Sequence, residues 1–301
     1  MKRSHRHALA GILVAALAAS ASIAAAGAGA QGPSLNAAGR AGIVWEHGQE
    51  TAAAHANARG NRSPDLIFHG GPVQWNGSVV YPIFWGTSWS SYKGDEITGI
   101  NSFYARVGNS AYAATNTEYY DASGRHVSPA VTGFAASIDP TAAPTKAPST
   151  SAVLAEVAKM YPNPTPGAYY PVYVDQPRGS AGYCAWHSAG TINGTPVQFG
   201  FFFKLDGDPG CDPNSPNTSM SEGLAALGNV SGHELSEMLT DPQLNAWYDS
   251  SGNENADKCA WTFGPSLINF GGGYSWKIQG NWSNAAYDSN SGYVRGCIDT
   301  A

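Results

Sequence analysis

Short apolar runs and longer helical repeats alternate along the middle of the sequence. Runs rich in β-branched and aromatic residues predict buried strands over Val79–Trp85, Tyr169–Asp175 and Val197–Leu205. Two further runs, Glu118–Tyr120 and His126–Val131, flank a polar turn and predict the arms of a hairpin. The sequence therefore predicts a sheet assembled from several short strands.

Apolar residues at helical spacing predict three helices, over Asp95–Val107, Ser151–Met160 and Met220–Leu239. The last helix has the clearest boundaries. Ser219 and Glu222 form the capping-box pattern that satisfies the first free amide donors of a helix. Pro242 prevents the helix from continuing, because proline cannot supply a backbone N–H.

Beyond Asp241-Pro242 the sequence is rich in Gly, Asn, Trp and Tyr and shows no helical period. Strands and helices thus alternate early, and loops with short strands follow the long helix. This order predicts an α+β (mixed α/β) fold with a short mixed sheet, one long helix and a loop-rich C-terminal part.

The N-terminus has the pattern of a secretory signal peptide, predicted over residues 1–30. A basic start precedes the apolar core Ala8–Ala26, and Ala28-Gly29-Ala30 offers a small-residue cleavage site. Residues 31–63 are rich in Ala, Gly, Asn and Arg and predict a flexible leader or pro-segment. Residues 64–301 are then expected to form a single globular domain, and the protein is expected to be secreted.

The net charge of the sequence argues against some classes of binding partner. Without the three basic residues of the signal peptide, 13 basic residues face 22 acidic ones, a formal net charge of −9. No cluster of Lys and Arg remains, which argues against a nucleic-acid partner. No stretch outside the N-terminus approaches the roughly 20 apolar residues of a membrane span. We expect the protein to be a monomer whose substrate is an extracellular protein or peptide.

Four cysteines occur, Cys184, Cys211, Cys259 and Cys297. An even number in an exported chain indicates two disulfides, for which three pairings are possible. We expect Cys184–Cys211 and Cys259–Cys297, since each bridge then closes one local loop. A cysteine-based zinc site is disfavoured because the sequence has no C-x-x-C.

The long helix carries the candidate chemistry in His233-Glu234-Leu235-Ser236-Glu237. His233 and Glu237 lie one turn apart and can bind one divalent metal, as in H-E-x-x-H with a carboxylate as the second ligand. Glu234 could act as general base on a metal-activated water. Alternatively, His233 and Glu237 form a solvent-facing pair worth about 0.3–0.5 kcal/mol.

A third metal ligand is expected in the acidic segment Trp247–Trp261. Asp257 follows His233 by 24 residues, a separation similar to that of the third ligand in gluzincins. Glu254 is the competing ligand. The same carboxylates could be ordinary loop residues, or the oxygen-rich Asp249–Asp257 loop could bind calcium.

His187 is the second catalytic candidate, as a hydrogen-bond donor to the transition state or as an extra ligand. The alternative is a histidine packed beside Trp186. The predicted strand Val197–Leu205 could be the edge strand along which an extended peptide substrate binds.

Several landmarks together resemble the phosphate-induced/EXORDIUM-like family of secreted proteins. The resemblance covers roughly residues 66–298 and rests on order and spacing. Its landmarks are His69-Gly-Gly-Pro72, Phe84-Trp85-Gly86, Cys184 with His187, Thr240-Asp241-Pro242, the acidic segment and Tyr287-Asp288 with Cys297. The resemblance implies an extracellular protein. The plant members are linked to growth signalling, and this chain looks more like a bacterial branch that carries the H-E-x-x-E helix.

These observations predict a secreted zinc-dependent metallopeptidase on a zincin-like domain. Zinc would be bound by His233, Glu237 and Asp257. The alternative is a non-catalytic, EXORDIUM-like extracellular binding or signalling protein with at most a structural metal. A carbohydrate-active enzyme is a third hypothesis, which rests only on the abundant aromatic residues.

Overall fold

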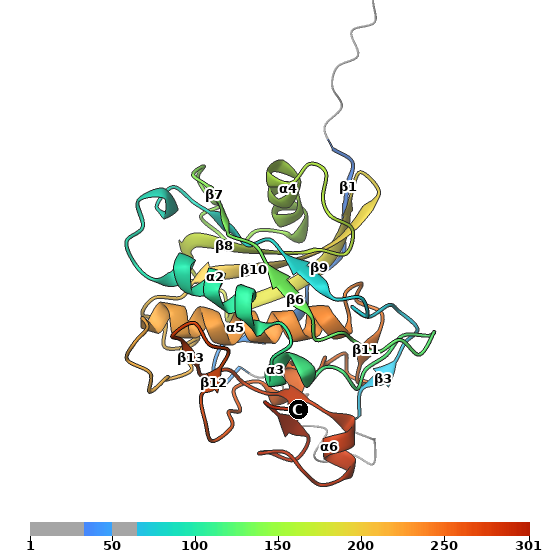
Figure 1. Cartoon of the computed structure of the whole chain (residues 1–301). Helices are drawn as coiled ribbons and strands as arrows, with labels where there is room; N and C mark the ends of the chain where they lie inside the picture. The colour runs from blue at the N-terminus through green and yellow to red at the C-terminus, as the bar shows by residue number, and fades with distance from the viewer. Residues whose placement is uncertain (1–32, 50–64) are drawn as a thin grey trace, which may run out of the picture. The chain divides into compact units, whose positions relative to one another are not determined.

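The computed structural model describes residues 33–49 and 65–301, and a nine-stranded mixed sheet is its largest element (Figure 1). The strands of this sheet are β1 (Leu35–Ala37), β2 (Ala41–Trp45), β4 (Ser78–Val80), β5 (Ile83–Trp85), β6 (Val131–Gly133), β7 (Ser137–Asp139), β8 (Tyr169–Pro177), β9 (Tyr183–Ile192) and β10 (Thr195–Lys204). β10 pairs in parallel with β8, and parallel pairing continues through β4 and β5 to β6 and β7. On its other side β10 pairs antiparallel with β9, whose outer edge carries β1 and β2.

Helices cover both faces of this sheet. The helices of the described residues are α2 (Glu96–Val107), α3 (Ala111–Ala114), α4 (Thr150–Met160), α5 (Glu222–Thr240) and α6 (Asn284–Asp288), with 3₁₀ turns η1 (Trp89–Ser91) and η2 (Asp257–Cys259), and α3 and α6 lie beyond α5, away from the sheet. α4 packs on one face, and α2 and α5 lie on the other (Figure 1). None of the helices in the described ranges combines the length and hydropathy needed to cross a bilayer.

A loop-rich C-terminal part lies on the side of α5 that faces away from the sheet (Figure 1). It contains three two-stranded pairs: β3 (Ile67–Phe68) with β11 (Trp247–Tyr248), β12 (Ile268–Asn269) with β13 (Ser275–Trp276), and β14 (Asn281–Trp282) with β15 (Cys297–Ile298). The mixed sheet, the helices and this part confirm the predicted α+β class.

The α5 helix is buried on all sides, and its ends are set by specific residues. Every residue from Gly223 to Thr240 is buried. Ser221 caps the helix, with its Oγ accepting from the Leu224 N–H at 3.0 Å. The prediction that Ser219 caps it is wrong, because the Ser219 Oγ donates to Asn217 instead. The helix ends at Thr240, ahead of Pro242 as predicted.

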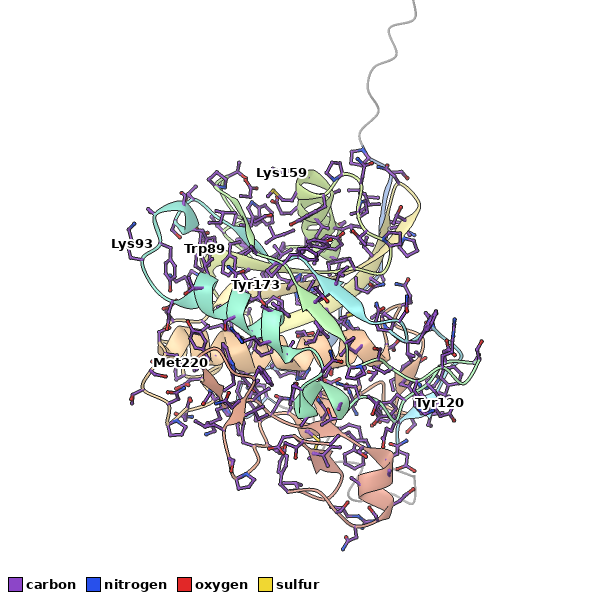
Figure 2. All side chains as sticks on the ribbon, in the orientation of Figure 1. Trp89, Lys93, Tyr120, Lys159, Tyr173 and Met220 are labelled. Atoms are coloured by element: carbon purple, nitrogen blue, oxygen red, sulfur yellow. A yellow bond between two sulfur atoms is a disulfide. The ribbon has the colours of Figure 1, made fainter. Side chains whose placement is uncertain are left out.

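A chain of hydroxyl groups fixes α5 against the sheet. Tyr173 of β8 lies in the interior between the sheet and the two helices (Figure 2). Its hydroxyl lies 3.0 Å from the Tyr104 hydroxyl of α2 and 2.8 Å from Ser231 Oγ of α5. Because buried polar atoms require hydrogen-bond partners, these hydroxyl contacts fix the position of α5 relative to β8.

Three predictions about the strands need correction. The predicted strand Val79–Trp85 is divided into β4 and β5 at Pro82, which cannot donate to a strand ladder. The predicted hairpin is reduced to a single bridge between Tyr120 and His126, and β6 pairs with β4 instead. The strand Val197–Leu205 does not form an edge, because β10 lies between β8 and β9.

The N-terminal part of the described chain belongs to the main sheet. Residues 33–49 fall within the predicted leader, yet they contain β1 and β2, which pair with β9. Leu35 lies opposite Ile192, and Val44 lies opposite Ala185. The folded part therefore starts before residue 64. The predicted signal peptide and residues 50–63 of the leader lie outside the described residues.

Both predicted disulfides are confirmed. Cys184 of β9 is bonded to Cys211, and Cys259 of η2 is bonded to Cys297 of β15, each with Cα atoms 5.8 Å apart. The second bridge joins the acidic segment to the C-terminal strand pair. It therefore limits how far this segment can move from α5.

Glu96, in the first turn of α2, is fully buried against the first turn of α5. Burial raises the pKa of Glu96 to about 8, and the nearby carboxyl group of Asp206 adds to this shift. The folded state therefore binds a proton at Glu96 more tightly than the unfolded chain does. Its contribution to stability is complete below about pH 4.5 and is lost as the pH rises through about 8.

We predict that Glu96→Gln flattens this pH dependence, because glutamine keeps the shape of the protonated side chain and does not titrate. Between pH 5 and pH 9 the free energy of unfolding of the wild type should fall relative to the variant, by at most about 1.4 kcal/mol per pH unit. Urea unfolding at several pH values measures this difference. Glu222→Gln, at the exposed start of α5, is the control and should follow the wild type. Parallel curves for wild type and Glu96→Gln would contradict the prediction.

Candidate metal centre

Six ionisable side chains meet where the C-terminal half of α5 passes between the sheet and the acidic segment. They come from α5, from β9 and from the turn that leads into η2, and are His233, Glu234, Glu237, His187, Glu254 and Asp257. Five are at most 3% exposed, and the Asp257 side chain is 18% exposed. We call this group the acidic cluster.

One side of the acidic cluster has the geometry of a metal site. The Nε2 atom of His233 lies 3.1 Å from Glu237 Oε1 and 3.6 Å from Asp257 Oδ1. The three ligand atoms lie within 4.8 Å of one another. Zinc–ligand distances of about 2.0–2.2 Å place neighbouring ligand atoms roughly 3–4 Å apart. These three residues could therefore hold a metal ion.

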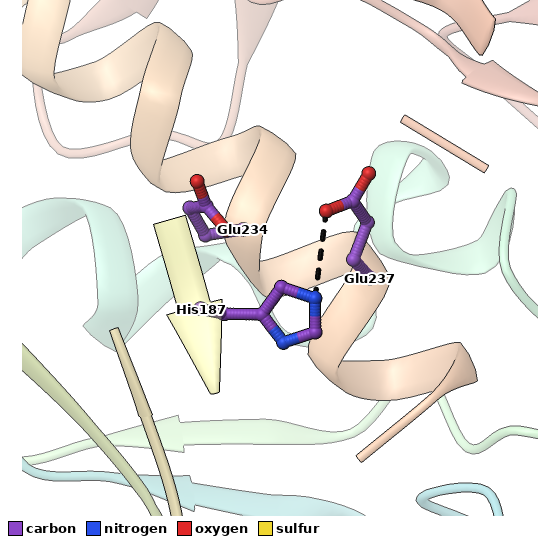
Figure 3. Close-up of side chains that lie close together, drawn as sticks. All are labelled: His187, Glu234 and Glu237. Atoms are coloured by element: carbon purple, nitrogen blue, oxygen red, sulfur yellow. Dashed lines mark ion pairs between the residues drawn. The ribbon is translucent and has the colours of Figure 1, made fainter. Parts of the chain in front are cut away.

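The other side of the cluster faces the sheet. His187 extends from β9 toward Glu237, with Glu234 on the preceding turn of α5 (Figure 3). His187 Nε2 lies 2.9 Å from Glu254 Oε2 and 3.6 Å from Glu237 Oε2. Ligand atoms of His187, Glu234 and Glu237 also lie within 4.8 Å of one another. Glu237 thus belongs to both sides, with one oxygen toward each histidine.

Backbone amides hold the acidic segment in place. The Asp257 N–H donates to Glu237 Oε1 at 3.0 Å, and the Glu254 N–H donates to Asp257 Oδ2 at 3.1 Å. Asp257 is therefore the residue that approaches His233, while Glu254, the competing ligand, contacts His187. Cys259, two residues further on, joins this turn to β15.

Gln279 is part of the site, and the sequence analysis missed it. Its amide nitrogen donates to His233 Nδ1 at 2.9 Å and to the Ala256 carbonyl at 2.8 Å. Because Nδ1 accepts here, a neutral His233 carries its proton on Nε2, facing Glu237. Gln279 lies 46 residues beyond His233 with no motif around it, so local spacing could not have indicated this contact.

Burial and the crowding of carboxyl groups determine the protonation of the cluster. Burial raises the pKa of Glu234 and Glu254 well above the ordinary value and also raises that of Glu237, and neighbouring carboxylates add to each shift. Burial lowers the pKa of His187. Burial acts in the same direction on His233, but Glu237 and Asp257 outweigh it and hold its pKa well above the usual range. The cluster therefore requires protons or a cation to balance its acidic groups.

Several atoms of the cluster are buried without an aligned hydrogen-bond partner. Among the described residues these include both carboxylate oxygens of Glu234, Glu237 Oε2, Glu254 Oε1 and His233 Nε2. A buried polar atom without a partner costs about 1–3 kcal/mol, more if it is charged. A bound cation would satisfy the ligand atoms among them, so the donor set fits a metal.

The structure also tests the alternative roles of the His233–Glu237 pair, of His187 and of the Asp249–Asp257 loop. His233 and Glu237 are 0% exposed, which excludes a solvent-facing pair. His187 does not only pack beside Trp186, since it contacts Glu254. In the proposed calcium loop, Asp249 accepts hydrogen bonds from Asn253 and from the Lys258 ammonium group at 3.2 Å. A lysine paired with this carboxylate disfavours calcium there.

Comparison with known proteins identifies no relative. No family model matches the sequence, and no curated protein or solved structure resembles it closely enough to count as a match. The interpretation of the acidic cluster therefore rests on its own geometry and chemistry.

We predict that the Cys259–Cys297 bridge supports metal binding. In a Cys259→Ser/Cys297→Ser variant, the Glu254–Asp257 turn loses a covalent anchor, so the affinity for Zn²⁺ should fall by about 10–100-fold. Competition with a chromophoric chelator measures the affinity, and circular dichroism verifies that the variant is folded.

The matched control is Cys184→Ser/Cys211→Ser. This bridge also starts near the cluster, but β9 keeps its hydrogen bonds to β10 and β2 when the bridge is removed. Its Zn²⁺ affinity should stay within a few-fold of the wild type. Equal losses in the two variants would show that the bridges act only through general stability.

Proposed function

We propose that the protein is a secreted zinc-dependent metallopeptidase that hydrolyses peptide bonds in extracellular proteins or peptides. The observation that carries this proposal is the meeting of His233, Glu237 and Asp257 within 4.8 Å, with the unpartnered carboxyl group of Glu234 within the same distance of Glu237. One ligand set and one free carboxyl group are the minimum that metal-assisted hydrolysis requires.

The donor set favours zinc over calcium. His233 offers a nitrogen, and Glu237 and Asp257 offer oxygens, which is the mixed set that zinc accepts in catalytic sites. Calcium takes six to eight oxygen ligands and does not select imidazole. His233 and Glu237 are fully buried, and Asp257 is the one ligand that is partly exposed.

Each remaining residue has a role in this proposal. When bound, zinc supplies Lewis acidity that activates water and polarises the scissile carbonyl. Glu234 takes up the proton, and burial raises its pKa well above the ordinary value, which makes the carboxylate a stronger base. His187 Nε2 is paired with Glu254 Oε2 at 2.9 Å, so donating to the developing oxyanion would require His187 to exchange Glu254 for the substrate.

Gln279 acts as a positioning residue. If His233 held a metal through Nε2, the neutral imidazole would keep its proton on Nδ1 and would need an acceptor there. Turning the Gln279 amide over would present its oxygen to Nδ1, but it would break the hydrogen bonds to the Ala256 carbonyl and from the Trp261 N–H. Gln279 therefore positions the ring of the neutral, metal-free His233, and metal binding would require this rearrangement.

A second candidate function is supported by the burial of the cluster. Structural zinc sites are closed to solvent, and five of the six residues here are nearly unexposed. The protein would then be a non-catalytic extracellular binding protein with a structural metal, in line with its resemblance to EXORDIUM-like proteins. The two functions differ in the role of Glu234, which is the general base in the peptidase and has no catalytic role in the binding protein.

We predict that the purified chain without residues 1–30 contains about one equivalent of zinc, and that His233→Ala removes it. The remaining carboxylates hold zinc poorly because they lack a nitrogen ligand. Elemental analysis measures the zinc content. His126→Ala, at an exposed histidine outside the cluster, should keep its zinc. A wild type that binds no zinc would rule out both the peptidase and the structural metal.

We predict that Glu234→Gln keeps its zinc and loses hydrolysis by about 10²–10⁴-fold, since it removes only the general base. Hydrolysis of casein, gelatin and peptide libraries measures the rate, with Glu222→Gln on the same helix as the matched control. The assay uses the intact chain and a chain cut between residues 50 and 64. Full activity in Glu234→Gln, or no hydrolysis by either wild-type form, would favour the binding protein.

A further inference from the structure

The acidic cluster is covered by β2. This strand runs antiparallel to β9, with Ala41 opposite His187. On its other side β2 packs against α5 and η2, the two elements that carry the proposed metal ligands. Residues 41–45 therefore fill the space between the edge of the sheet and the site.

Gly42 shows how close this approach is. A Cβ atom at this position would overlap Glu237 Oε2 and would lie 2.7 Å from His187 Nε2. Gly42 also has a φ of +49°, in the left-handed region that favours glycine. Only a residue without a side chain can place its backbone here, directly against two groups of the proposed active site.

Contacts on both sides of Gly42 hold the strand in this position. Ser188 Oγ donates to the Gly39 carbonyl at 2.7 Å. Beyond Gly42, Trp261 Nε1 donates to the Trp45 carbonyl at 2.8 Å, and Glu46 pairs with Arg178. β1 and β2 pair with β9 alone, so their departure would leave the order of the other strands in the sheet unchanged.

The edge that β2 occupies is the place where a peptide substrate would have to lie. Peptides commonly bind by adding an antiparallel strand to an exposed sheet edge. β9 is the strand that carries His187, and its outer edge is filled by this chain's own residues. The residues proposed to bind and cleave a peptide are meanwhile almost unexposed.

From this arrangement we propose that β2 is an intramolecular occupant of the substrate groove and that the described chain is a latent form. This inference rests on the function proposed above, and it also defines the substrate. It is an extended peptide that pairs antiparallel with β9 once residues 41–45 have left, with its backbone where Gly42 now lies.

The first test introduces a side chain at the contact. In the full chain, Gly42→Ala should force β2 away from Glu237 and His187. Hydrolysis of a peptide library should then rise at least tenfold, and His187 should react faster with diethyl pyrocarbonate, as mapped by mass spectrometry. Gly39→Ala is the matched control, because a Cβ there meets nothing within 4 Å. It should behave as the wild type in both measurements.

The second test does not depend on how Gly42→Ala folds. A specific protease site is placed between residues 50 and 64 of the full chain and cut after folding. The cut chain should release the N-terminal fragment and show the same rise in hydrolysis and in His187 reactivity. A synthetic peptide of residues 33–49 should restore the latent state, and the same peptide with Gly42→Ala should not.

The outcomes separate this inference from the proposed function. Hydrolysis at equal rates by cut and intact chains would overturn the inference and leave the peptidase in place. Higher His187 reactivity without any hydrolysis would support β2 as the cover and overturn the peptidase. Unchanged His187 reactivity in both the cut chain and Gly42→Ala would overturn the inference.

Discussion

Burying three carboxyl groups and partly burying a fourth costs free energy that each group must recover from a partner. Around α5 the partners are imidazoles and backbone amides, and Glu237 has both kinds. The surrounding elements follow from this requirement. β9 supplies His187, and the segment before η2 supplies amides as well as further acids. Among the described residues, both oxygens of Glu234 lack an aligned hydrogen-bond partner, as does one oxygen each of Glu237 and Glu254, and this part of the cost is not offset.

Different residues contact the Glu237 carboxylate from the two sides of α5. The sheet side presents a histidine on a strand held by neighbours on both edges, which fixes its position closely. The opposite side presents Asp257 on a turn held by two amide hydrogen bonds and a disulfide. Glu237 therefore links a strand paired on both edges to a covalently anchored turn. Contacts of this kind fix the orientation of side chains that could bind a metal.

Local spacing in the sequence was enough to predict α5, the meeting of His233 with Glu237, and the approach of Asp257. These depend on helical periodicity and on a short connection after the helix. The disulfides were predictable for a similar reason, because each bridge closes one loop. β9, Gly42 and Gln279 were not predicted, since their roles arise from pairing between segments far apart in the chain. The apolar run Ala41–Trp45 was the available signal for β2, and the surrounding Ala and Gly residues obscured it.

The covered edge of β9 has a consequence for the behaviour of the protein at high concentration. If β1 and β2 left, the peptide groups of β9 from Tyr183 to Ile192 would lose their partners along one side. An open edge of this length is a template for strands from other molecules, including a second copy. Opening would then produce a species prone to self-assembly. The opened form would persist until a strand from another molecule paired with β9. It would therefore persist longer in dilute solution.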